Sequence, residues 1–276
     1  MSRPLKTPPP RSLLISRILS ALVLGPMALA AAYFGSLVFA AFLAIGAMIM
    51  VYEFIGMLRL SGGWPATFLT VSGFFALSLF LIADAGGGVL IWYLVVISTG
   101  GALAALGLLA RRRRLVWLGG SVAYIWIPVL AFLWLRTTED GLALVLWAFL
   151  LVWGTDIGGY FVGRAIGGVR LAPRISPNKT WSGLVGGIAF ALAGSLFAWA
   201  VARPLPLVWM ALLTPPLAVW SQIGDIAESA LKRRWGAKDS GHIIPGHGGI
   251  LDRVDGLMFV APLLALFTFI FMMTRP

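Results

Sequence analysis

The chain has 276 residues, of which 60% are hydrophobic and only 11% are charged, and it contains no cysteine. This composition excludes an ordinary soluble domain, a disulfide framework and a thiolate metal site, and it predicts a polytopic membrane protein. The net charge of +11 could suit nucleic acid, but the basic residues lie between apolar segments, so membrane lipid and phosphate-bearing substrates are the expected partners and nucleic acid is not.

A basic, proline-rich tail over 1–13 precedes a series of apolar runs long enough to cross a bilayer. The pattern predicts an all-α bundle of about nine transmembrane helices, divided into N-terminal spans over 14–135 and a C-terminal region over 141–276. The first run resembles a cleavable signal peptide, but its length favours an uncleaved span. The expected spans are 14–34, 36–58, 66–83, 88–110, 115–135, 141–161, 181–202, 207–225 and 256–273.

The basic residues segregate between alternate loops, and this predicts the orientation. With nine spans and a cytoplasmic N-terminus, the inner segments hold 18 of the 21 Lys and Arg residues, which leaves Arg136, Arg203 and Arg275 outside. The positive-inside rule therefore predicts a protein of the cytoplasmic membrane, with its N-terminus and the loops 164–180 and 226–255 in the cytoplasm, where nucleoside triphosphates are found.

Asp156 lies near the end of the sixth expected span. A carboxylate at membrane depth is costly and commonly functional, although an interfacial residue at a helix end is the alternative. The neighbouring glycines, Gly154, Gly158 and Gly159, permit close helix packing at this level.

The loop 164–180 carries four cations, and positive-inside bias alone would explain its arginines. The segment Ser176-Pro177-Asn178-Lys179-Thr180 is different. Its proline is expected to fix a turn, and Thr180 can cap the seventh span, so that the helix N-terminus faces the loop. This arrangement suits a phosphate, and Lys179 is the predicted phosphate ligand.

The most polar stretch runs from Asp225 to Asp255 and holds half of the ten acidic residues and both histidines. Four of its residues fall at i, i+3, i+4 and i+7 and would share one face of a helix: Asp225, Glu228, Ser229 and Lys232. A loop rich in glycine and proline separates them from the last apolar run. Carboxylates beside cations, with glycines at a helix N-terminus, are what a metal-bound polyphosphate requires.

Asp225 and Asp252 are the strongest candidates for metal ligands. Asp225 follows an apolar span, where an uncompensated carboxylate is expensive, so a metal ion or a neighbouring cation must balance its charge. For Asp252 the alternative is an ordinary N-cap of the last span. Asp255 could be a ligand or could pair with Arg253.

The two histidines, His242 and His247, do not indicate zinc. They lie five residues apart with proline and glycine between them, and no cysteine or third histidine completes a tetrahedral set. His247, which lies between glycines, is better suited to a hydrogen bond with a phosphate or a leaving pyrophosphate.

The spacing S-x-L-K-R-x4-K-D-x-G-x3-P-x-H-G-G-I-x-D-R-V-D over 229–255 resembles the signature of the phosphatidate cytidylyltransferases, also called CDP-diacylglycerol synthases. Two further blocks resemble the same family: Asp156 to Gly163 together with 176–181, and Gly224-Asp225 leading to Glu228-Ser229. The blocks cover the C-terminal half, whereas the N-terminal half resembles the family only as a series of membrane spans.

The resemblance implies an enzyme that transfers the cytidylyl group of CTP to phosphatidate, giving CDP-diacylglycerol and pyrophosphate. It also implies Mg²⁺ at Asp225 and Asp252, with Asp156 or Asp239 close by, a second cation such as K⁺, and a homodimer. Because the attacking phosphate oxygen is already an anion, positioning and charge neutralisation would do most of the chemistry. The residues expected to act on the phosphates are Lys179, Lys232, Arg233, Lys238, Asp239, His247 and Arg253. Those expected to contact substrate are Ser176, Asn178, Lys179, Thr180, Ser229, Gly248 and Gly249.

Two other functions stay open from the sequence alone. A membrane enzyme could join CTP to another lipid phosphate by the same mechanism, because no segment defines the lipid pocket. An ion-coupled transporter could use Asp156 and Asp225 as intramembrane sites. Many transporters, however, consist of repeated halves with broken helices, and no internal repeat is visible here.

Overall fold

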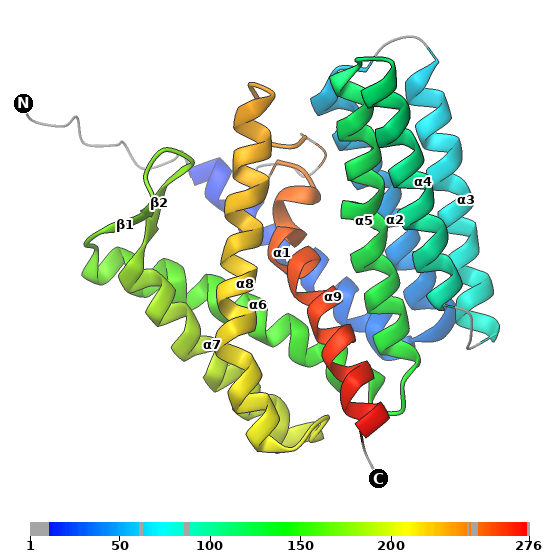
Figure 1. Ribbon diagram of the computed structural model, residues 1–276. Helices are drawn as coiled ribbons and strands as arrows, with labels where there is room; N and C mark the ends of the chain where they lie inside the picture. The colour runs from blue at the N-terminus through cyan, green and yellow to red at the C-terminus, as the bar shows by residue number, and fades with distance from the viewer. Residues whose placement is uncertain (1–10, 61–62, 86–88, 242, 244–247, 275–276) are drawn as a thin grey trace, which may run out of the picture.

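The computed structural model describes residues 11–60, 63–85, 89–241, 243 and 248–274. Within these ranges the chain forms nine α-helices and one two-stranded hairpin, packed together as a bundle (Figure 1). The helices are α1 Arg11–Phe34, α2 Ser36–Leu58, α3 Trp64–Ala85, α4 Val89–Leu109, α5 Arg113–Thr137, α6 Gly141–Ile166, α7 Trp181–Ala202, α8 Leu207–Arg234 and α9 Leu251–Thr274. The strands are β1 Arg170–Ala172 and β2 Ser176–Thr180, which pair antiparallel between α6 and α7.

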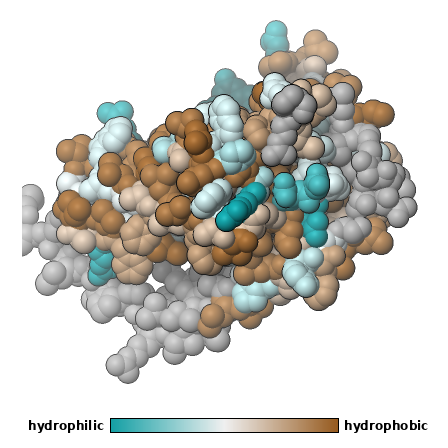
Figure 2. All heavy atoms as spheres, turned by 90° about the horizontal axis from the view of Figure 1, so that it is seen from below, coloured by the Kyte–Doolittle hydropathy of each residue, from teal (hydrophilic) through white to brown (hydrophobic). Residues whose placement is uncertain are grey.

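The structure confirms the predicted helical membrane bundle. In the part of the chain that it describes, seven helices are long and apolar enough to cross a membrane, all except α1 and α3. Helices α1 and α3 contain shorter apolar segments, Leu22–Phe34 and Trp64–Phe80. Seen from below the view of Figure 1, the molecule presents mostly apolar residues, with few hydrophilic ones among them (Figure 2). Such a surface is stable against lipid and not against water.

Helices α5 and α9 join the two halves of the bundle. One core cluster is built mainly from α2, α3 and α5, and a second is built mainly from α5, α6, α8 and α9. The fully buried Trp126 of α5 belongs to the first cluster, and the fully buried Trp147 of α6 belongs to the second. The indole nitrogen of Trp147 donates to Ser195 Oγ of α7 at 2.7 Å, which satisfies its polar group inside the core.

Glycines bring α6 and α7 into close contact, as the sequence predicted around Asp156. A Cβ atom on Gly158 would lie 2.5 Å from the carbonyl oxygen of Gly186, and one on Gly187 would lie 2.7 Å from that of Thr155. Side chains at these positions would push the helices apart. The packing fixes α6 against α7, and therefore fixes the hairpin that connects them.

Helix α8 extends further than the sequence predicted. The loop expected over 226–255 is shorter, because α8 continues to Arg234 and α9 begins at Leu251. The segment after Asp225 contains good helix formers, and its terminal Lys and Arg residues face the negative end of the helix dipole. Asp225, Glu228 and Lys232 consequently lie on a rigid helix.

The hairpin was not predicted. Its turn is formed by residues 173–175, and Pro177 lies inside β2, so the expectation that this proline fixes the turn was wrong. A proline is tolerated in a strand that pairs on one side only, as β2 does. The other prediction for this segment is confirmed, because Thr180 caps α7 and its side chain accepts a hydrogen bond from Gly183 N at 3.1 Å.

The basic segments gather at one end of the bundle. In Figure 1 the ends of α2, α4 and α8 and the hairpin lie at the top, whereas the connections from α5 to α6 and from α7 to α8 lie at the bottom. Arg114 of α5 donates to the carbonyl oxygen of Arg59 at 3.0 Å, which places these two cationic segments together. The loops that are rich in basic residues in the sequence thus lie together at one end of the folded bundle.

Candidate active site

Several of the predicted site residues meet in the upper part of the bundle, where β2, α8 and α9 come together (Figure 1). Lys179 of β2 pairs with Asp225 of α8, and Lys232 of α8 pairs with Asp252 of α9. Lys232 Nζ also lies 3.4 Å from Glu228 Oε1, one turn earlier on the same helix. These side chains are largely buried, and opposite charges at contact distance offset the cost of that burial. Three elements that are distant in sequence thus share one network of charges.

The two carboxylate oxygens of Asp225 differ in their hydrogen bonding. Oδ2 contacts Lys179, whereas Oδ1 is buried and has no hydrogen-bond partner among the described residues. The same is true of Ser221 Oγ, one turn earlier on α8. A Cβ atom on Gly256 of α9 would lie 2.5 Å from Ser221 Oγ and 3.3 Å from Asp225 Oδ1, so both oxygens point to the same place. Because unpartnered buried oxygens are costly, their convergence indicates a place for a ligand.

Asp252, in contrast, has both carboxylate oxygens occupied. Oδ1 contacts Lys232, and Oδ2 accepts from Ser240 N at 2.9 Å, Ser240 Oγ at 3.0 Å and Gly249 N at 2.9 Å. These donors precede Asp252 in the chain, so the carboxylate is not an ordinary N-cap, which would accept from residues that follow it. Gly248 has φ +86° and would place a Cβ atom 2.7 Å from Asp252 Oδ2, so only glycine fits there.

The remaining acidic candidates are placed around Asp225. Asp156 is exposed on α6, and its Oδ1 accepts from Gln222 Nε2 of α8 at 3.2 Å. Asp255 Oδ1 accepts from Gly256 N at 2.9 Å. Both carboxylate oxygens of Glu228 are buried without a hydrogen bond to any described residue. The cluster is therefore richer in carboxylates than in cations that neutralise them.

These donors fit a hard divalent cation in part. Carboxylate and hydroxyl oxygens are the ligands that Mg²⁺ prefers, and Asp225 and Ser221 supply them. Among the residues with described positions, however, no three acidic or histidine side chains converge as a complete metal site. Mg²⁺ commonly takes only one or two carboxylates and completes its shell with water and substrate phosphates, which this arrangement allows.

Several predicted phosphate ligands lie exposed around this cluster. Arg233 and Lys238 are exposed and form no hydrogen bond or ion pair with any described residue. Asp239, Arg253 and Asn178 are exposed as well, and Ser176 and Ser229 are partly exposed. His247 lies outside the described residues. The backbone amide of Gly249 donates a hydrogen bond to Asp252, so within the protein this predicted substrate contact is already used.

Four further polar residues were missed by sequence reasoning. Glu53 of α2 is buried and accepts from the loop before α9. A single acid inside an otherwise apolar span was the available signal for it. Ser221, Gln222 and the buried hydroxyl of Tyr124, which has no hydrogen-bond partner among the described residues, carried no signal of their own.

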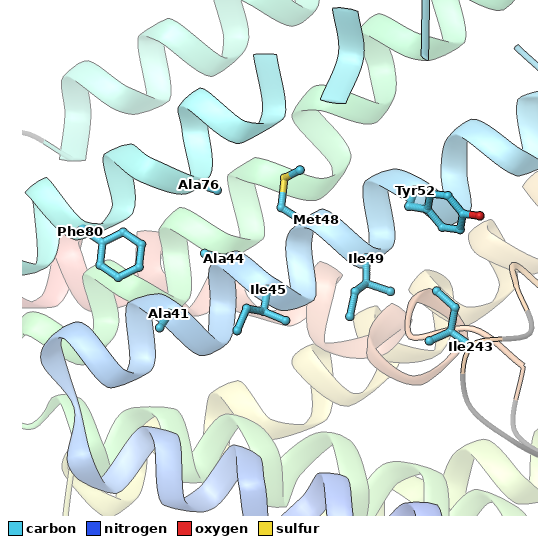
Figure 3. Close-up of a pocket in the computed structure, with 9 residues that line it drawn as sticks. All are labelled: Ala41, Ala44, Ile45, Met48, Ile49, Tyr52, Ala76, Phe80 and Ile243. Carbon is cyan, nitrogen blue, oxygen red and sulfur yellow. The ribbon is translucent and has the colours of Figure 1, made fainter. Parts of the chain in front are cut away.

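A separate cavity of about 460 Å³ lies along α2 and α3 (Figure 3). No charged side chain lines it, so nothing there would neutralise a triphosphate. Its end is formed by Ile243, which belongs to the same loop as Ser240. The lining residues are Ala41, Ala44, Ile45, Met48, Ile49, Tyr52, Ala76, Phe80 and Ile243.

A membrane-embedded helical bundle with carboxylates and unpaired cations at one end has the features of an enzyme that acts on phosphate groups at a membrane surface. The chain belongs to the cytidylyltransferase family, whose sequence profile matches residues 15–271. This confirms the family resemblance of the motifs over 229–255.

The similarity to curated relatives extends over nearly the whole chain. A phosphatidate cytidylyltransferase of Brucella suis biovar 1 (strain 1330) is 43% identical over 266 residues, which cover 93% of each chain. Proteins of the same name from Bacillus subtilis (strain 168) and Staphylococcus haemolyticus (strain JCSC1435) are 45% and 48% identical over 154 and 145 residues. These two matches cover 54% and 52% of this chain, and 57% and 55% of the relatives.

Proposed function

We propose that this chain transfers the cytidylyl group of CTP to phosphatidate, giving CDP-diacylglycerol and pyrophosphate. The observation that carries the proposal is the family match over residues 15–271, joined to a cluster of carboxylates and cations at one end of the bundle. The relatives that match over 93% of their length are named for this reaction. Of the two other functions open from the sequence, transport has no support from this family.

The reaction requires charge neutralisation more than acid–base catalysis. A phosphate oxygen of phosphatidate would form the new bond to the α-phosphorus of CTP, while the bond from that phosphorus to the β-phosphate oxygen breaks and pyrophosphate leaves. Since the nucleophile is already an anion, no strong base is needed. Lys179, Lys232, Arg233 and Lys238 are the cations that would hold the phosphate oxygens during this exchange.

We assign cation binding to Asp225, with Ser221 beside it, because their free oxygens converge. Mg²⁺ held there would neutralise phosphate oxygens as charge moves to the leaving group. Asp252 stays a predicted second ligand through Oδ1, which contacts Lys232 among the described residues. The second cation and the homodimer also stay predictions. Activity measured with and without K⁺, and a mass measurement in detergent, test them.

The apolar groove along α2 suits an acyl chain of the lipid substrate. Its α2 residues run from Ala41 to Tyr52, a length of about 16 Å at the rise of an α-helix. One end lies at Ile243, in the loop that carries the partners of Asp252, so a lipid headgroup at the site would leave its chain beside the groove.

Filling this groove tests the assignment. Ile45 is 63% exposed, and Ile45→Trp should raise the KM for long-chain phosphatidate about three- to tenfold, which is the effect of about 1 kcal/mol. The KM for a short-chain phosphatidate and for CTP should not change. Leu37→Trp, at a position of α2 outside the groove, is the matched control. Equal effects on long and short chains would remove the groove from the substrate site.

The site is proposed to face the cytoplasm, because the basic segments gather at the same end of the bundle. Single cysteines at Arg170 and Lys238, both exposed, should be protected from a membrane-impermeant maleimide applied to intact cells. They should react after the membrane is opened. Labelling of either cysteine in intact cells would contradict the proposed orientation, because the site would then lie on the side of the membrane without nucleoside triphosphates.

The function itself is tested with purified protein and radiolabelled CTP. Label should enter lipid with phosphatidate and Mg²⁺, and pyrophosphate should appear in equal amount. Other lipid phosphates, added in turn, separate phosphatidate from the alternative acceptors. Incorporation with another lipid phosphate and none with phosphatidate would show that the acceptor has been assigned wrongly.

A further inference from the structure

Glu53 is a buried acid from the N-terminal half of the chain that contacts the catalytic half directly. It lies in α2 and is 3% exposed. Its Oε1 accepts from Ile250 N at 2.8 Å, and its Oε2 accepts from Leu251 N at 3.0 Å and from Ser240 Oγ at 3.2 Å. One carboxylate therefore binds both the first residues of α9 and the loop that precedes it.

A short chain of hydrogen bonds connects Glu53 to the residues that are proposed to bind phosphate. The hydroxyl of Ser240, which reaches Glu53, also lies 3.0 Å from Asp252 Oδ2, and Asp252 contacts Lys232. Glu53 itself contacts neither lysine of the site. Any effect that it has on substrate must pass through Ser240, Asp252 and the N-terminus of α9.

The surroundings of Glu53 are shaped around its carboxylate. A Cβ atom on Gly249 would lie 2.5 Å from Oε2, and one on Gly241 would lie 3.0 Å from Oε1. Neither position leaves room for a side chain. In the part of the chain with described positions, no Lys or Arg forms a salt bridge with Glu53. Its charge is stabilised by amides and by the positive end of the α9 dipole.

We propose that Glu53 is a positioning residue for the cytidylyl transfer. It holds the N-terminus of α9 and the segment around Ser240, so that Asp252 and Lys232 keep the places from which they act on the phosphates. The inference rests on the proposed function. It adds a residue from the N-terminal spans to a site otherwise built from β2, α8 and α9.

The chemistry of the pocket explains why a carboxylate is needed. All three partners are donors, and a carboxylate presents acceptors at both of its oxygens. In Glu53→Gln the amide nitrogen would face at least one of these donors, and that hydrogen bond would be lost with almost no change in volume. Glu53→Asp keeps both acceptors but withdraws them by one methylene.

The test compares Glu53→Gln with Glu139→Gln, which makes the same substitution at an exposed glutamate in the connection between α5 and α6. In purified protein matched for folded amount, Glu53→Gln should lower kcat/KM for CTP by about tenfold or more and raise the Mg²⁺ concentration for half-maximal activity. Glu139→Gln should match wild type. Glu53→Asp should fall between wild type and Glu53→Gln.

A double-mutant cycle separates positioning from a general loss of structure. Ser240 connects Glu53 to Asp252, so Glu53→Gln with Ser240→Ala should lose less activity than the product of the two single losses. Fully multiplicative losses, or wild-type kcat, KM and Mg²⁺ dependence in Glu53→Gln, would overturn the inference.

A second measurement needs no enzyme activity, so it separates failure of this inference from failure of the proposed function. If Glu53 holds the loop, Glu53→Gln should expose the bonds after Arg234 and Lys238 to trypsin several-fold faster than wild type. Glu139→Gln should be cut at the wild-type rate. Unchanged cleavage in Glu53→Gln would show that Glu53 does not hold the loop, whatever lipid the enzyme accepts.

Discussion

The two ion pairs of the site have the same composition but different surroundings. Lys179 with Asp225 and Lys232 with Asp252 each join a lysine to an aspartate inside the bundle. Asp252 accepts three further hydrogen bonds from the loop that precedes it. Asp225 accepts none, and its Oδ1 is buried without a partner among the described residues.

This difference separates a carboxylate that organises the protein from one that is available to a ligand. The three bonds to Asp252 hold a loop in place, and breaking them costs stability. A buried oxygen without a partner costs stability for as long as it stays so, and proteins retain such groups where function requires them. Asp225 is therefore the better candidate for direct contact with a cation, and Asp252 for control of Lys232 and the loop.

The largest expected effect follows from neutralising Asp225. Asp225→Asn should lower activity by about 10²–10³-fold, the scale for losing a group that stabilises charge during the reaction. Its effect on the free energy of unfolding should be smaller than that of Asp252→Asn, because the amide oxygen can still accept from Lys179 and Oδ1 makes no hydrogen bond with a described residue. Activity assays and thermal unfolding of the purified protein measure the two quantities.

Asp252→Asn is the matched variant at the other pair. It should also remove most activity, but it should destabilise the protein by about 1–3 kcal/mol, because an amide nitrogen would face Lys232 or the donors of the loop. If the two aspartates share a cation, the double variant should be hardly worse than either single one. Full activity in Asp252→Asn with normal Mg²⁺ dependence would leave Asp225 as the one aspartate of the centre.

The sequence was sufficient to predict the helices and several of the charged residues that the structure brings together. The apolar runs placed most helix ends within a few residues, although α8 continues to Arg234, well beyond its expected end at 225. The spacing from Asp225 to Lys232 predicted the shared face that α8 shows. Helix periodicity and span length are local properties, so they can be read from one segment at a time. Thr180 was predicted as a cap for the same reason.

What was missed depends on contacts between distant segments. Glu53 meets Ser240 across 187 residues, and nothing near Glu53 in the sequence indicates that partner. The contrast between Asp225 and Asp252 was also hidden, since it depends on which backbone amides reach each carboxylate. The hairpin was missed because its strands are short and one contains a proline, which weakens any strand pattern.

Removing either lysine should have an intermediate effect on activity, and the two variants should again differ in stability. Lys179→Ala and Lys232→Ala should each lower activity by about tenfold or more, since both cations are expected at phosphate oxygens. Lys232→Ala should lower stability more than Lys179→Ala, because it leaves two buried carboxylates, Glu228 and Asp252, without a cation, whereas Lys179→Ala leaves one. The exposed Arg112, at the same end of the bundle, provides the control, and Arg112→Ala should be near neutral in both measurements. A greater loss of stability in Lys179→Ala would reverse the two roles.

The smallest effects are expected from two serines, one beside each aspartate of the two ion pairs. Ser240→Ala removes a hydroxyl that binds Glu53 and Asp252, so it should cost about 1–3 kcal/mol of stability and lower activity only a few-fold.

Ser221→Ala removes a buried hydroxyl with no partner among the described residues, so stability should stay the same or rise slightly. If this hydroxyl faces a bound cation together with Asp225 Oδ1, however, the Mg²⁺ concentration for half-maximal activity should increase about three- to tenfold, the effect of losing about 1 kcal/mol of binding. A variant that is as stable as wild type and binds Mg²⁺ less well would support a cation beside this hydroxyl. Wild-type Mg²⁺ dependence in Ser221→Ala would place the cation away from Gly256 and leave Oδ1 of Asp225 without its proposed role.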